Sequence, residues 1–227
     1  MNINLVSTYV IAEKDGNTTK YDVLDYHVIK QQNVKPYVYD ENYIDTYNHL
    51  DCTSMSKLRY DNIVSVIGRK PNSLLDVGYG NGNFLQYCYN QGVEKLYGYD
   101  VSPQPTPQPA KRVNNLVIGN YDVITFFDSL EHMEDAYSVV NSLAHCNYVC
   151  ISVPECRESS SFTLSWFNGW KHRKIDEHIW YFSKTSLVKF MNTLDYKLIH
   201  LNNVEDNIRK NADGEPNILT AIFEKSI

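Results

Sequence analysis

The sequence predicts an α/β fold built on a mostly parallel β-sheet with helices on both faces. From about residue 56 onward, short apolar runs alternate with segments of helical periodicity, which is typical of a parallel sheet covered by helices. A glycine-rich turn at residues 78–82 separates the first apolar run from the helix that follows. A chain of 227 residues can bury one complete core, so we expect one main domain over residues 52–227 and a small extension over residues 1–51.

The segment at residues 74–84, LLDVGYGNGNF, combines a strand, a turn and the start of a helix. Its apolar residues form the short run of a buried parallel strand. Gly78, Gly80 and Gly82 follow, where a Cβ atom would obstruct a tight turn. A glycine turn lets the backbone approach a ligand closely, and the helix that begins at Asn83 offers unpaired N–H groups. We therefore interpret this segment as a ligand-binding loop.

A second strand at residues 95–98 leads to Asp100, about 20 residues after the glycine loop. A carboxylate at the tip of the neighbouring strand can accept two hydrogen bonds from ribose hydroxyls. A dinucleotide site shares the glycines and the downstream acid. However, a G-x-G-x-x-G motif that starts at Gly78 requires glycine at position 83, and the chain has Asn83 there. An acid, Asp76, also precedes the loop.

Further strands and helices follow in the alternating order. Ser183 is the expected N-cap of a late helix that buries Leu187, Val188 and Phe190. A proline that cannot continue a ladder closes the strand at residues 147–154. The expected elements are strands at 121–128, 147–154, 196–201 and 217–223, the last an antiparallel edge strand, and helices at about 134–144 and after 183.

The pattern D-x-G-x-G-x-G followed by Asp100 resembles the first motif and the second-strand acid of class I S-adenosylmethionine-dependent methyltransferases. The run YDVITFFD and the SLEH that follows it look like the family's fourth motif, so the resemblance covers about residues 56–227. It implies a Rossmann-like, seven-stranded sheet, S-adenosylmethionine as cofactor and S-adenosylhomocysteine as product. The implied reaction is methyl transfer to an oxygen, nitrogen or carbon of a small-molecule acceptor.

The resemblance also implies which residues bind the cofactor. Arg59, on the helix before the glycine loop, resembles an arginine that binds the cofactor carboxylate in ubiquinone-pathway O-methyltransferases, although a surface helix arginine is the simpler reading. The remaining implied cofactor residues are Asp76, Gly78, Tyr79, Gly80, Gly82, Phe84, Asp100, Val101, Asp128, Ser129 and Leu130.

Asp128, Glu131, His132 and the distant His178 form a second constellation. We expect His132 and His178 to converge on the acceptor side of the pocket as catalytic residues, either as a general base or as a hydrogen-bonding group. The pattern also resembles the metal site of small-RNA 2′-O-methyltransferases, where a divalent ion orients vicinal hydroxyls. Asp128 departs from the usual glutamate, and L-E-H is widespread in methyltransferases without a metal, so we assign no metal ligand. A structural role for both histidines is the third alternative.

The segment between Asp100 and the next strand departs from the family. Residues 102–110, SPQPTPQPA, carry four prolines and cannot form a regular helix, while residues 115–118 could form a shortened strand. The acid that contacts the adenine amino group in most relatives is missing, and backbone atoms around Asn120 would have to replace it. This departure keeps open a non-catalytic module that binds the cofactor or serves as an interaction protein. It also suggests that a partner or a second subunit, as in a homodimer, covers an exposed sheet face.

The first residues are unlike the rest. Residues 5–12 and 21–29 are β-like runs separated by a turn at residues 14–17, where Asp15-Gly16 predicts a hairpin. A tyrosine-rich stretch at residues 37–47 follows. The extension is either a lid that shapes the acceptor pocket or a hairpin that packs on the sheet edge.

Composition limits the partners and the location. The net charge of −6 argues against a nucleic-acid acceptor, although residues 171–174 are basic and lie beside three aromatic residues, as a solvated turn or as part of a lid. No apolar run reaches about 18 residues and no leader segment is visible, so we expect no membrane span and a cytoplasmic location. The five cysteines lack C-x-x-C spacing and are expected to be reduced thiols, with Cys150 in an apolar strand.

Overall fold

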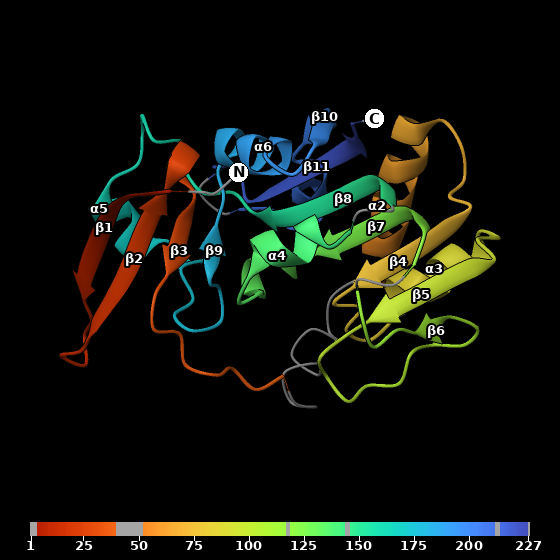
Figure 1. Cartoon of the computed structure of the whole chain (residues 1–227), viewed down its shortest axis with the longest axis horizontal. Helices are drawn as coiled ribbons and strands as arrows, with labels where there is room; N and C mark the ends of the chain where they lie inside the picture. Colours follow the sequence, from red (N-terminus) through yellow and green to blue (C-terminus); the bar gives the residue numbers. More distant parts are fainter. Residues whose placement is uncertain (1–3, 40–51, 117–118, 144–145, 212–213, 227) are drawn as a thin grey trace.

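The structure is a computed structural model that describes residues 4–39, 52–116, 119–143, 146–211 and 214–226. Its main element is a seven-stranded sheet with the strand order β10-β11-β8-β7-β4-β5-β6 (Figure 1). The five strands from β8 to β6 are parallel to one another. The strands are β4 (Ser73–Val77), β5 (Lys95–Tyr99), β6 (Lys111–Arg112), β7 (Tyr121–Phe127), β8 (Cys146–Pro154), β10 (Tyr196–Asn202) and β11 (Ile218–Lys225).

Helices cover both faces of this sheet. Leu74 and Val123 belong to a core cluster shared with the first two helices, whereas Leu75 and Ile124 belong to a cluster shared with two later ones. Successive side chains of a strand point to opposite faces, and helices cover both faces here. The two central strands, β4 and β7, are therefore buried along their whole length. The helices are α2 (Cys52–Ile67) and α3 (Asn83–Asn90) on one face, and α4 (Ala136–Asn141) and α6 (Lys184–Asn192) on the other.

Helix boundaries follow local signals. Ser183 caps α6 as predicted, and its side chain accepts a hydrogen bond from the Ser186 N–H in a capping box. Leu187 and Phe190 are buried, and Val188 packs against the same core. The helix expected at about 134–144 is shorter, because a 3₁₀ turn, η2 (Leu130–His132), precedes it and Asp135 caps α4 one residue before its start.

The antiparallel pairing at one end of the sheet is confirmed. The edge strand is β10, which pairs antiparallel with β11. The strand expected at residues 217–223 is β11, and it lies one position inside the edge, antiparallel to both β10 and β8. The apolar sequence pattern does not distinguish an edge strand from the strand next to it here, because both faces of β11 are buried over Ile218–Phe223.

The proline-rich segment forms no regular helix in the described residues 102–116, as predicted. The short strand expected at residues 115–118 is wrong for residues 115 and 116, which form no strand, while residues 117 and 118 lie outside the described residues. The strand that pairs with β5 is instead β6, two residues long, opposite Tyr97 and Gly98. Arg112 stabilises this position because its guanidinium donates to the backbone oxygens of Asp100, Ser102 and Gln104.

The N-terminal hairpin is confirmed, and it is part of a second sheet with the order β1-β2-β3-β9. Gly16, with φ of +85°, makes the turn between its two arms. The strands are β1 (Leu5–Ala12), β2 (Thr18–Leu24), β3 (Ile29–Gln31) and β9 (Trp180–Tyr181), with a 3₁₀ turn η1 (Asp25–His27) before β3. Figure 1 shows this sheet to one side of the large sheet, with β1 outermost.

The fourth strand of the small sheet comes from the second half of the chain. β9 pairs with β3, and a core cluster joins Tyr21 and Ile29 to Phe167 on α5 (Leu164–Gly169). The side chain of Arg173, in the basic run at 171–174, is 5% exposed and forms an ion pair with Glu13. The extension is therefore attached by strand pairing, by apolar packing and by a buried ion pair.

For four of the five cysteines, the expectation of free thiols agrees with the structure. Cys88, Cys146, Cys150 and Cys156 are free and buried, and burial raises the pKa of each thiol. They are therefore unreactive core residues. Across the described ranges, no helix combines the length and apolar character needed to span a bilayer.

Candidate cofactor and acceptor site

The glycine loop joins β4 to α3, and its three glycines have positive φ angles of 81°, 53° and 76°. A Cβ atom at Gly78 would lie 2.6 Å from Cβ of Ser129, and one at Gly82 would lie 2.5 Å from Pro107. At Gly80, no described atom lies within 4 Å of that position. Gly78 and Gly82 thus let protein segments pack on the loop, whereas Gly80 leaves space in which a ligand can approach the backbone.

Asp100 lies at the carboxyl end of β5, next to this open position. One carboxylate oxygen accepts the N–H of Gly80 at 2.8 Å, and the other accepts the N–H of Ser102 at 2.7 Å. An ionised carboxylate has about four acceptor positions, so both oxygens can also accept ligand hydroxyls. Val101 follows with 71% of its surface exposed, which offers an apolar contact for a planar base. These residues fit a ribose and its base.

Asp76 lies below the loop at the end of β4 and is buried. Its Oδ1 accepts a hydrogen bond from the Thr125 hydroxyl at 2.7 Å. Burial raises the pKa of Asp76 to about 6, while the Thr125 hydrogen bond and Arg59 act in the opposite direction. A second hydrogen bond joins β4 to the segment after β7, because the Ser129 hydroxyl donates to the backbone oxygen of Val77 at 2.6 Å. Both contacts hold the end of β4 against the end of β7.

Arg59 and Asp128, both expected to contact the cofactor, are paired with each other at 2.8 Å. Arg59 also binds Glu205, and Arg209 binds Asp128 and Glu205. Two arginines and two carboxylates therefore form a closed, charge-balanced quartet, with Glu205 fully buried. Sequence reasoning missed Glu205 and Arg209, for which the only local signal is an acid and a base four residues apart.

Three other residues expected at the cofactor site support the loop from behind. The Tyr79 hydroxyl donates to the backbone oxygen of Gln104 at 2.6 Å and accepts from Arg112 at 2.9 Å, so this side chain faces the proline-rich segment. Phe84 is buried and packs edge-on against Phe127, and Leu130 is buried in the opposite core. Their side chains hold the loop and the end of β7 in place.

The structure brings His132 and His178 together, with ring centroids 4.6 Å apart. Nδ1 of His178 lies 2.9 Å from the carbonyl oxygen of His172, which can only accept, so this nitrogen carries the proton and Nε2 is left as an acceptor. Nδ1 of His132 lies 3.2 Å from the Tyr39 hydroxyl. Burial lowers the pKa of His132 to about 4 and that of His178 to about 2, so both rings are neutral at pH 7.

Glu131 completes this cluster. One ligand atom from each of Glu131, His132 and His178 lies within 4.8 Å of the others, and Asp128 is not part of the group. Glu131 is 1% exposed, and its Oε2 has no hydrogen-bond partner among the described atoms. Burial, and then the charge of Asp128, raise the pKa of Glu131. Two neutral imidazoles beside such a carboxyl can hold a proton, a polar ligand or a divalent cation.

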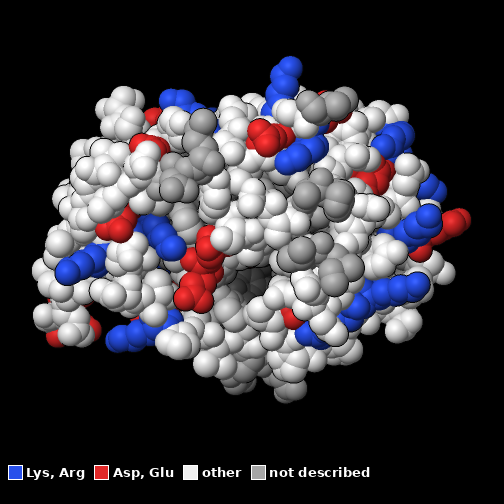
Figure 2. All heavy atoms as spheres, in the orientation of Figure 1, with Lys and Arg blue, Asp and Glu red and all other residues white. Residues whose placement is uncertain are grey.

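The surface in Figure 2 has acidic and basic side chains interspersed, with a group of acidic side chains beside a hollow near its centre. On this face the basic side chains do not merge into one continuous patch.

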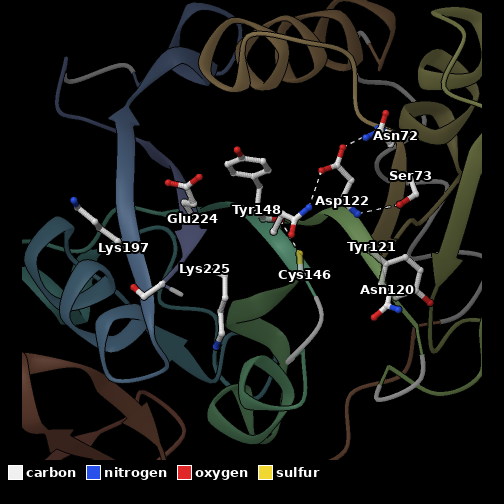
Figure 3. Close-up of a pocket in the computed structure, with 12 residues that line it drawn as sticks. Asn72, Ser73, Asn120, Tyr121, Asp122, Cys146, Tyr148, Lys197, Glu224 and Lys225 are labelled. Atoms are coloured by element: carbon white, nitrogen blue, oxygen red, sulfur yellow. Dashed lines mark hydrogen bonds between the residues drawn. The ribbon is translucent and has the colours of Figure 1, made fainter.

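A groove of about 940 Å³ lies elsewhere, at the amino ends of the parallel strands. Asp122 is its buried acid, and its carboxylate already accepts hydrogen bonds from Arg69 and Asn147. It also accepts the N–H of Asn72 (Figure 3). Ligands of open α/β sheets bind at the carboxyl ends of the strands. The groove is therefore separate from the glycine loop, and its buried carboxylate has a structural role.

Comparison with known proteins agrees with this geometry. Residues 54–201, more than half of the chain, match a family described as a methyltransferase domain. No curated protein matches the sequence.

Solved structures share the fold at low sequence identity. The 1,6-didemethyltoxoflavin N1-methyltransferase of Burkholderia thailandensis, solved with its substrate and S-adenosylhomocysteine, is 12% identical, with 98% of this chain and 100% of that chain covered and a TM-score of 0.58. The magnesium protoporphyrin IX methyltransferase of Synechocystis, solved with S-adenosylhomocysteine, is 14% identical, with 85% and 90% covered and a TM-score of 0.54. The [4+2]-cyclase SpnF is 11% identical, with 77% and 83% covered and a TM-score of 0.57.

Proposed function

Because the chain belongs to the class I S-adenosylmethionine-dependent methyltransferases, we propose that it methylates a small-molecule acceptor held beside His132 and His178. The observation that carries this proposal is a pair of neutral, adjacent imidazoles, with ring centroids 4.6 Å apart. His132 follows β7 at the carboxyl edge of the sheet, and His178 comes from the segment just before β9. The accepting atom is an oxygen, a nitrogen or a carbon. The narrower resemblance to ubiquinone-pathway O-methyltransferases and the cytoplasmic location remain predictions.

The described residues fit S-adenosylmethionine. The space beside Gly80 suits the part of the ligand that touches the backbone, and Asp100 presents two oxygens to the ribose. Arg59 is the candidate for the cofactor carboxylate, which would have to share its guanidinium with Asp128 and Glu205. The bound cofactor supplies a methyl group on a sulfonium, so the protein mainly has to position the acceptor and exclude water.

The histidine pair suits the positioning of an acceptor. Nε2 of His178 is unprotonated, because the His172 carbonyl holds the proton on Nδ1. This nitrogen can therefore accept a hydrogen bond from an O–H or N–H group of the molecule that is methylated. The low pKa values mean that the charged imidazolium is penalised by burial, which favours hydrogen bonding over full proton transfer to a lone histidine. Oε1 of Glu131 lies 3.9 Å from Nε2 of His132, which is beyond direct hydrogen-bond distance but leaves both atoms within reach of a polar group held between them.

The interspersed surface charges in Figure 2 and the net charge of −6 support a small molecule over a nucleic acid. The Burkholderia enzyme that shares the fold acts on a small heterocycle. The [4+2]-cyclase shares the same fold, and one fold can carry different reactions. The alternative function is therefore a non-catalytic binding module or an enzyme that catalyses another reaction.

A metal-assisted reaction is the second candidate, because Glu131, His132 and His178 approach one another as metal ligands do. Neutral imidazoles with one carboxylate suit Mn²⁺, Fe²⁺ or Zn²⁺. A cation there would ionise Glu131 and satisfy its unpartnered Oε2. Such a site would orient the vicinal hydroxyls of a diol or an RNA end.

The deciding experiment replaces each histidine with alanine and measures cofactor affinity and turnover separately. His132→Ala and His178→Ala should leave S-adenosylhomocysteine affinity nearly unchanged and lower turnover on a panel of acceptors about 100-fold or more. His200→Ala is the matched control, because this histidine lies on the edge strand β10 and bonds to Asn202. Unchanged turnover in both site variants would leave the histidines with a structural role.

The metal candidate needs its own measurements. If a cation is required, a chelator should abolish turnover of the parent, added Mn²⁺ should restore it, and titration calorimetry should detect Mn²⁺ binding that Glu131→Gln removes. A parent that keeps full turnover in chelator and binds no Mn²⁺ excludes the metal candidate and leaves the hydrogen-bonding role.

A further inference from the structure

We propose that β1 is a dimerisation edge, at which two copies of this chain pair their β1 strands antiparallel about a two-fold axis at Val10. β1 is the outermost strand of the small sheet and pairs with β2 along one side only, with no described strand on its other side (Figure 1). An unpaired strand edge presents a row of N–H and C=O groups that another strand can bind.

The sequence of β1 lacks the usual protection of an edge. Residues 5–12, LVSTYVIA, contain no charged residue and no proline. Within the regular part of β1, Val10 is 56% exposed, while Leu5 and Val6, at the bulged end outside the proposed pairing, are 59% and 63% exposed. Soluble proteins normally place lysine, proline or a bulge on such an edge, and here only a bulge between Leu5 and Ser7 is present.

The hydrogen bonds of the hairpin identify which backbone groups face outward. The Glu13 N–H donates to the Asn17 oxygen, and this pair continues the β1–β2 register that sets Val10 opposite Lys20. Bonded and non-bonded pairs alternate in an antiparallel ladder, so Val10 and its neighbours at 8 and 12 direct their N–H and C=O groups away from β2. On the other side of β2, the Gln32 N–H donates to the Lys20 oxygen, as this alternation requires.

A second copy fits these groups in register. A two-fold axis perpendicular to the sheet at Val10 sets Val10 opposite Val10 of the second copy, and Thr8 opposite Ala12. The two side chains of each pair then lie on the same face of the combined sheet. Six outward groups on each strand give about six backbone hydrogen bonds. The pairing stays within the regular part of β1, beyond the bulge, and joins two four-stranded sheets into one continuous sheet.

The absence of charge favours a second copy over a charged peptide as the occupant. Across the axis, the row of side chains reads Lys20, Val10, Val10 of the second copy and its Lys20, so two apolar residues meet and the lysines stay separated. The contact is small, and the expected dimer is therefore weak and concentration-dependent.

The test is sedimentation velocity of the full chain over a range of concentrations, with variants at position 10. The parent should change from monomer to dimer as concentration rises. Val10→Lys should shift this transition at least tenfold higher in concentration, because it brings four positive charges into one row, and salt should partly reverse the shift. Val10→Glu should interfere less, because the glutamate is opposite Lys20 of its own sheet.

Two further variants separate strand pairing from other contacts. Val10→Pro removes an outward N–H without removing a β1–β2 hydrogen bond, and should also give a monomer. Val38→Lys, at a 72% exposed valine outside the strands, is the matched control and should dimerise like the parent. Circular dichroism verifies that each variant is folded. A parent that stays monomeric at high concentration, or a dimer that survives both Val10→Lys and Val10→Pro, overturns the proposal.

Discussion

Asp100→Asn tests the assignment of the ribose site with almost no change in side-chain size. In the parent, the carboxylate accepts two backbone N–H groups, at 2.8 and 2.7 Å, and keeps lone pairs for two ligand hydroxyls. The amide has one acceptor oxygen, and its NH₂ group would face an N–H donor. Loss of two hydroxyl contacts should cost about 1 to 3 kcal/mol of binding free energy, which is about a 5- to 150-fold weaker Kd.

The assay is calorimetric titration with S-adenosylhomocysteine, alongside thermal unfolding without ligand. Asp61→Asn is the control, because Asp61 is an exposed acid that pairs with Lys57 on α2. Since Asp100 also holds the loop through Gly80 and Ser102, a small loss of stability is expected in the ligand-free protein. Equal affinity of Asp100→Asn and the parent would refute the assignment of Asp100.

Two further predictions concern the loop and the acid beneath it. Gly80→Ala should keep the melting temperature within about 5 °C of the parent, because its Cβ enters open space, and should lose cofactor binding, because that space is where the ligand approaches the backbone. Gly78→Ala should lower the melting temperature further, because its Cβ meets Ser129 at 2.6 Å. Scanning calorimetry and a binding titration compare the two variants, and loss of binding without loss of stability in Gly78→Ala would contradict this order. For Asp76, the folded pKa of about 6 lies above the unfolded value near 3.8, so ionisation opposes folding as pH rises from about 4 to above 6. Thr125→Val removes a hydrogen bond to the ionised form and should cost about 1.5 to 3 kcal/mol at pH 8 but less at pH 5, as measured by urea unfolding; an equal loss at both pH values would contradict it.

Local sequence determined the parts of the fold whose signals lie within a few residues. The glycine loop, the cap at Ser183 and the hairpin turn at Gly16 each depend on backbone conformations that their own residues favour. The buried runs of β4 and β7 were readable for the same reason, because a strand covered on both faces is apolar throughout. The family assignment followed from these local features.

Only the tertiary structure decided which distant residues meet. Arg59 and Glu205 are separated by 146 positions, and no local pattern in either segment specifies the partner. The same holds for β9, a two-residue strand that completes the N-terminal sheet. It also holds for Glu131, because its proximity to His178 depends on the packing of segments far apart in the chain.

The physical reason is that local conformation depends on the few bonds and neighbours of each residue, whereas long-range pairs depend on how whole elements pack. The sequence determined that Arg59 lies on a helix and that Asp128 follows a buried strand. Packing of α2 and the segment at residues 204–209 against the end of β7 then brought both arginines and both carboxylates together, so that burial was compensated by opposite charge.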